Sequence, residues 1–133
     1  MTEPRAHVFE YALLRVVPRV DRGEAINAGV LLYCRQLGYL GARVHLDPER
    51  LRALDPAADV EAIQQALQST ADICGGSPGA GRAGGEEIGR RFRWLTAPRS
   101  TVVQPGPVHT GITTDPEADA DRLLQTLVLA IRG

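Results

Sequence analysis

The sequence predicts an α+β protein: a mostly antiparallel sheet that begins as a three-stranded meander, with helices packed on one face. Three short apolar stretches near the N-terminus have the patterns of strands, and Gly38 marks a tight connection between the second and the third. Near the C-terminus, leucines recur at helical spacing instead, which predicts an amphipathic C-terminal helix. Together these patterns predict one sheet with its helices in a separate layer.

The three strands of the meander differ in how they should be buried. Residues 7–17 carry apolar side chains on both faces at their centre, so this strand should be covered on both sides. A polar hinge at 18–28 leads into a second, almost wholly apolar strand at 29–34. The third strand, 39–46, alternates and should have one solvated face. Its expected inward residues are Leu40, Ala42, Val44 and Leu46, and its outward residues are Gly41, Arg43 and His45.

Helix starts are marked by an acidic residue followed by proline. Such pairs precede the helices expected at 48–54, 57–74 and 116–131, since Asp caps a helix and Pro fits its first turn. At the last of these starts, Thr114 or Asp115 could be the cap. A further helix is expected at 86–95. The expected core residues of these helices are Val60, Ile63, Leu67, Ile73, Ile88, Phe92, Leu95, Leu123, Leu124, Leu127, Val128 and Ile131.

The remaining segments complete the predicted organisation. Two extended segments, 101–104 and 108–113, flank a proline-glycine-proline sequence at 105–107 that should force a turn. A flexible glycine-rich loop is expected at about 75–85. The 133 residues fit a single domain, 1–133, which is large enough to bury roughly two thirds of its unfolded surface without a metal or a disulfide.

The charge composition excludes several kinds of chemistry. The formal net charge is −1, which does not favour a nucleic-acid partner. All 15 basic residues are arginine, so a Schiff-base lysine or a phosphate-loop lysine is excluded. An anion site would therefore use arginine or backbone amides. No apolar run approaches the length of a membrane span, and Cys34 and Cys74 stand alone, so we expect a cytoplasmic protein with two buried thiols.

The first candidate site lies in the hinge, where Arg22, Glu24 and Asn27 fall within six residues, next to an apolar strand. In one interpretation Arg22 and Asn27 bind an anion or a carbonyl group, and Glu24 acts as a base or orients Arg22. In the structural alternative Asn27 bonds to backbone and Arg22 pairs locally with Glu24 or Asp21. Both interpretations remain open from the sequence.

The second candidate site comprises Arg99, Ser100 and Thr101 at one end of the expected turn and His109 at the other end. The turn could bring them close together. Arginine with two hydroxyls suits a phosphate or a carboxylate, and His109 could be a general acid or base. In the alternative interpretation, all four residues are structural.

Other motifs carry little weight. Residues 79–84 spell G-x-G-x-x-G, but no strand precedes them, so they do not predict a dinucleotide site. The histidines at 7, 45 and 109 lack ligand spacing, so neither a metal nor another cofactor is expected. Ser100 lacks the strand-turn-helix setting of a nucleophile. The mixed basic and aromatic residues at 90–94 could stack on nucleic acid, but they are better explained by Phe92 pointing inward and a solvated face of Arg90, Arg91 and Arg93.

Five segments together resemble a bacterial family known as domain of unknown function 3037. These are residues 9–18, 22–32, 94–104, 108–111 and 115–116, and they span most of the chain outside the glycine-rich loop. The family usually has larger apolar residues at the positions of Ala25 and Ile26. The resemblance implies an accessory role, because genes of this family often neighbour those of kinase-type proteins similar to the HipA toxin kinase. It also implies functional positions at Arg22, Glu24, Asn27, Arg99, Ser100 and His109.

Two functional hypotheses follow. In the first, the protein is a small cytoplasmic binding or accessory domain with an arginine-lined cleft, in which Arg22 and Arg99 provide charge while Asn27 and Ser100 provide hydrogen bonds. In the second, it is an enzyme that acts on a phosphate ester or an acyl group, with Glu24 or His109 as general base. If the two arginine clusters share one site, substituting either should weaken the same ligand or partner.

Overall fold

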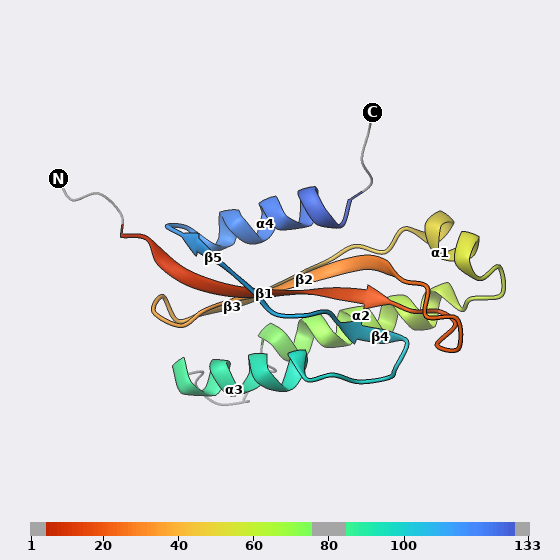
Figure 1. The fold of residues 1–133 in the computed structure, drawn as a ribbon, viewed down its shortest axis with the longest axis horizontal. Coiled ribbons are helices and arrows are strands. Elements are labelled where there is room, and N and C mark those ends of the chain that lie inside the picture. The colour runs from red at the N-terminus through yellow and green to blue at the C-terminus, as the bar shows by residue number, and fades with distance from the viewer. Residues whose placement is uncertain (1–4, 76–84, 130–133) are drawn as a thin grey trace.

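The computed structural model describes residues 5–75 and 85–129 and confirms the α+β class (Figure 1). In chain order the elements are β1 (His7–Val16), β2 (Ile26–Cys34), β3 (Tyr39–Val44), α1 (Pro48–Leu54), α2 (Val60–Gly75), α3 (Gly85–Thr96), β4 (Val103–Pro105), β5 (His109–Thr113) and α4 (Pro116–Leu127). The antiparallel β1-β2-β3 meander and the amphipathic C-terminal helix are confirmed. The expected glycine-rich loop falls almost entirely outside the described residues.

The sheet is completed by β4 and β5, which both pair antiparallel with β1. Val103 lies opposite Val16, and His109 lies opposite Tyr11. The expected turn at 105–107 is therefore wrong, because the chain passes from β4 to β5 in one direction along β1. The backbone N–H of Gly106 donates a hydrogen bond to the carbonyl oxygen of Leu13, and the nitrogen and the oxygen are 2.8 Å apart. The two prolines are tolerated here because this is an edge of the sheet, where a strand can lack N–H donors.

Helices cover both faces of the sheet (Figure 1). The expected packing on one face holds for α2 and α3, which enclose the larger core with the sheet. Helix α4 departs from it and packs over β2 and β3 on the opposite face, where a smaller core forms. The third strand consequently lacks the solvated face predicted for it: Tyr39 packs against the smaller core, and Arg43 pairs with carboxylates of α4.

The alternation of β1 between these two cores follows from its sequence. Leu14 and Val16 belong to the larger core, whereas Phe9 belongs to the smaller one. Strand β2 is central in the sheet and lies between the layers, which explains why it is apolar almost throughout. It begins at Ile26, earlier than expected. Gly38 has a φ of 61°, the left-handed conformation predicted for the hairpin connection.

The helices agree with the sequence patterns except in detail. Asp47 caps α1 and Asp115 caps α4, as expected, and α3 buries the three residues predicted for it. In α2, Ile73 is 41% exposed and Cys74 is buried in its place, so the inward face lies one position away from the prediction. Helix α4 ends at Leu127, before the expected end at 131. None of the helices in the described part of the chain is long and apolar enough to cross a membrane.

Candidate functional site

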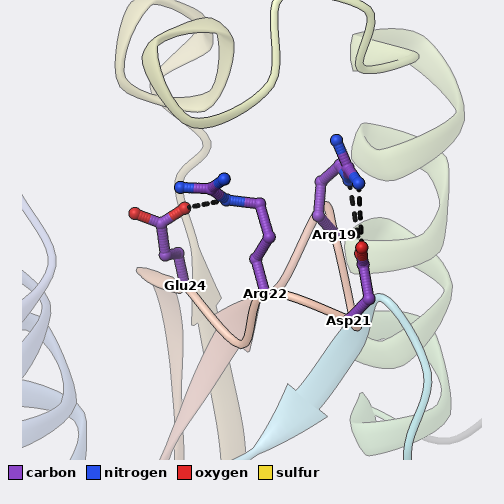
Figure 2. A network of polar contacts seen from close by, with 4 residues as sticks. All are labelled: Arg19, Asp21, Arg22 and Glu24. Carbon is purple, nitrogen blue, oxygen red and sulfur yellow. Dashed lines mark hydrogen bonds and ion pairs between the residues drawn. The ribbon is translucent and has the colours of Figure 1, made fainter.

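The hinge between β1 and β2 carries two ion pairs (Figure 2). The Nε of Arg22 donates to Oε1 of Glu24 at 2.6 Å, and Arg19 meets Asp21 at 2.8 Å. Gly23, with a φ of 71°, reverses the chain between the members of the first pair. The hydrogen bond from Arg19 lowers the pKa of the Asp21 carboxyl. Each pair therefore forms between residues two positions apart.

These ion pairs lie on the surface. The side chains of Arg22 and Glu24 are 57% and 45% exposed, so their attraction is screened by water and contributes little to stability. Glu24 engages Arg22 only through Nε; within the described residues, the two terminal nitrogens of that guanidinium meet no acceptor. The pair orients Arg22 and leaves its outer edge open to an incoming anion.

Asn27, near the start of β2, points to the opposite layer from the larger core. Its Nδ2 donates to the main-chain oxygen of Leu127 at 3.0 Å. This hydrogen bond connects β2 to the C-terminal end of α4. The amide is thus engaged in an intramolecular contact, as the structural alternative for the hinge required.

Arg99 is held against the end of α3. Its guanidinium lies 4.8 Å from the centre of the Trp94 ring and donates to the main-chain oxygens of Trp94 and Ala97. Ser100 and Thr101 are exposed, and the hydroxyl of Thr101 donates to Val103 at 2.7 Å. The arginine therefore caps the last turn of α3, with one face of its guanidinium on an indole that is itself 56% exposed.

One backbone hydrogen bond relates the hinge to the Arg99 segment. The amide of Val17 donates to the carbonyl of Val102 at 2.7 Å. The hinge begins directly after Val17, and residues 99–101 directly precede Val102, so both segments leave the same end of the β1–β4 pair. They are neighbours by topology, although each arginine is bonded within its own segment.

His109 lies apart from these two segments. It pairs with Tyr11, and the two ring centres are 5.3 Å apart. Tyr11 is six residues from Val17 along β1, a separation of about 20 Å for an extended chain. The absence of the expected turn explains the separation. The structure thus brings Arg22, Glu24, Arg99 and Ser100 to one end of the sheet. Asn27 lies at this end too but is bonded to α4, and His109 lies further along β1.

Sequence reasoning gave no role to Arg15, which projects from the same face of β1 as Tyr11. The signal was a charged residue that interrupts an apolar strand face.

Among the described residues, no group of three or more histidine, cysteine or acidic side chains could hold a metal ion. Both cysteines are free and buried, and burial raises the pKa of the Cys74 thiol to about 11, which disfavours a thiolate there.

The fold and these clusters define a small α+β domain with an antiparallel sheet between two helical layers and with Arg22 and Arg99 at one end of the sheet. The chain matches the family described as "Protein of unknown function (DUF3037)" over residues 11–128, and it belongs to that family. No curated protein and no solved structure matches it.

Proposed function

We propose that the protein is a cytoplasmic binding or accessory domain that presents Arg22 and Arg99 to an anionic or carbonyl-bearing group of its ligand or partner. The observation that carries this proposal is the hydrogen bond from Val17 to Val102, which joins the two arginine-bearing segments at one end of the sheet. A second support is the open outer edge of the Arg22 guanidinium. In this proposal Glu24 orients Arg22, and Ser100 adds a hydroxyl.

The proposed partner is a kinase-type protein. Support for it comes from membership of the DUF3037 family, through the gene neighbourhood that the resemblance implies. The exposed Trp94, with Arg99 on its ring, also suits a protein partner, since arginine and tryptophan contribute strongly to interfaces. Asn27 contributes indirectly in this proposal, through the attachment of α4.

The test is affinity capture from a cell extract, with the wild-type protein and single variants compared as bait. Arg22→Ala and Arg99→Ala should each reduce capture of the same partner from a cell extract, by about five- to thirty-fold in Kd once that partner is purified. Arg35→Ala is the matched control, because Arg35 is an exposed arginine in the β2–β3 connection, at the end of β2 opposite the hinge. Loss of binding in only one of the two variants would contradict a shared site. Unfolding of both would show that the arginines serve the fold.

The alternative proposal is an enzyme that acts on a phosphate ester or an acyl group, with Glu24 or His109 as general base. His109 is the better supported of the two, because its ring is exposed and its described contact is with the Tyr11 ring, whereas Glu24 is engaged by Arg22. Hydrolysis of p-nitrophenyl phosphate and p-nitrophenyl acetate tests it. Turnover by the wild type that His109→Gln or Glu24→Gln abolishes would support an enzyme, and absence of turnover would count against one.

A further inference from the structure

Among the described residues, Arg15 is the partly buried arginine whose side chain has no hydrogen-bond or ion-pair partner. In the described ranges, four arginines are partly buried, and the other three, Arg43, Arg91 and Arg99, each donate to carboxylates or carbonyl oxygens. The side chain of Arg15 makes no hydrogen bond or ion pair there. A guanidinium carries five donors, and polar groups withdrawn from water are normally bonded. The unused donors of Arg15 therefore require an explanation.

Arg15 is not needed to cap α4. Its neighbour across the β1–β2 pair is Asn27, which already donates to the carbonyl of Leu127. Arg50 donates to the next carbonyl, that of Val128, at 3.4 Å. The main-chain oxygens of Leu127 and Val128 are thus engaged by other side chains, and the Arg15 guanidinium is not used there.

The position of the guanidinium is defined by Gly106. A Cβ at this buried glycine would lie 3.3 Å from the Cζ and from the Nε of Arg15. The side chain of Arg15 therefore extends from β1 to the neighbouring segment between β4 and β5 and lies against the backbone of that segment. Glycine at this position lets the cation approach the strand closely.

Two aromatic rings share this face of the sheet. Tyr11 belongs to the smaller core and stacks against His109 at 5.3 Å between ring centres. Gly106 bonds to Leu13 and His109 lies opposite Tyr11, two positions further along β1, which places the ring pair about 7 Å from the backbone against which the guanidinium lies. Gln104 lies opposite Arg15 and adds an amide. Helix α4 packs over β2 and β3, and His109 on this face is exposed.

We propose that Arg15, Gln104, Tyr11 and His109 form a binding site, here named the Arg15 site, for a mononucleotide. The guanidinium and the Gln104 amide hold the phosphoryl group, and the Tyr11–His109 ring pair stacks on the base. The separation of about 7 Å suits a ligand whose phosphate and flat ring lie at opposite ends. This site is distinct from the surface of Arg22 and Arg99 and does not depend on it.

The test is a calorimetric titration of the full chain with the four common 5′-mononucleotides, inorganic phosphate and the matching nucleosides. At least one mononucleotide should bind saturably, and its nucleoside and phosphate should each bind at least tenfold more weakly. Arg15→Gln should weaken that nucleotide at least tenfold, whereas Arg52→Gln, an exposed arginine on α1, should leave the affinity unchanged. Absence of saturable binding by every mononucleotide overturns the proposal, as does equal affinity in Arg15→Gln.

A second measurement does not depend on the stability of a variant. In wild-type protein labelled with ¹⁵N, the Nε–H resonance of Arg15 and the amide of Gly106 should shift with the same saturation as the calorimetric signal. Tyr11→Leu should remove the advantage of the nucleotide over inorganic phosphate, because the stacking surface is lost. Shifts confined to the hinge around Arg22 would overturn the Arg15 site and favour the anion surface at the end of the sheet.

Discussion

The side chain of Asn27 and the main-chain oxygen of Leu127 are joined by a 3.0 Å hydrogen bond, although 100 residues separate them in the chain. The bond attaches α4 to β2 at the end of the helix, where carbonyl groups lack helical partners. A residue that looked like part of a hinge site therefore fixes the helix that closes the smaller core.

We expect Asn27→Ala to destabilise the protein by about 1–2 kcal/mol, because it leaves the partly buried carbonyl of Leu127 without this donor. Urea unfolding followed by circular dichroism measures this change. Gln64→Ala, at an exposed position of α2, is the control and should change stability by less than about 0.5 kcal/mol. Equal stability of the two variants would mean that the bond contributes nothing to the attachment of α4.

Cys74 should make stability fall with rising pH. Burial raises its pKa from 9.0 to about 11 in the folded protein, so between these values the unfolded chain releases a proton that the folded chain keeps. The contribution is fully present below pH 9 and is lost by pH 11, a decrease of roughly 2–3 kcal/mol. Unfolding curves at intervals across this range measure it.

The control for this slope is Cys74→Ala. This variant loses packing and is less stable at every pH, but its stability should fall less steeply between pH 9 and 11. Burial also raises the pKa of Tyr39, so some decrease at high pH should remain in the variant. Identical slopes in the two proteins would show that the Cys74 thiol does not contribute.

The single tryptophan should report on Arg99, whose guanidinium lies 4.8 Å from the Trp94 ring centre. In Arg99→Ala the indole loses this cover, so its fluorescence should shift to longer wavelength and its quenching by acrylamide should increase. Arg22→Ala, which removes a pair at the other segment, should leave the spectrum unchanged. An unaltered spectrum in Arg99→Ala would indicate that the stacking does not persist in solution.

Gly29 should not tolerate a side chain. A Cβ there would lie 2.8 Å from the carbonyl oxygen of Arg43, a backbone atom of the paired strand, and 3.1 Å from Leu14. We expect Gly29→Ala to cost about 1–3 kcal/mol, because the sheet must shift to accept the methyl group. Gly75→Ala, where nothing lies within 4 Å of the new Cβ, is the control and should be near neutral. Thermal unfolding distinguishes the two variants.

Local sequence signals predicted the elements of this fold well. The Asp47 and Asp115 caps and the left-handed Gly38 depend on residues a few positions apart, and all three are present in the structure. The side of the sheet taken by α4 could not be predicted, because an amphipathic pattern identifies a buried face but not the surface that buries it. The pairing of 103–113 with β1 was missed for the same reason: turn residues such as Pro105 and Pro107 also fit an edge strand.

The candidate site also divides into contacts between residues close in the sequence, which could be predicted, and contacts with distant segments, which could not. Arg22 and Glu24 are two positions apart, and their pairing was one of two alternatives that the sequence left open. The contacts of Asn27 and Arg15 depend on segments nearly the length of the chain away, so sequence spacing could not reveal them. The partner or ligand of Arg22 and Arg99 stays a prediction.

The pairing of β1 with both β2 and the segment that contains β4 and β5 has a consequence for how the protein is made. The β1-β2-β3 meander can form as soon as its first 44 residues leave the ribosome, but the other edge of β1 stays unpaired until residue 113 has been synthesised. During that interval an apolar strand with free hydrogen-bonding groups is exposed to other nascent chains. Folding should therefore be limited by closure of this long segment, and chains released early should aggregate.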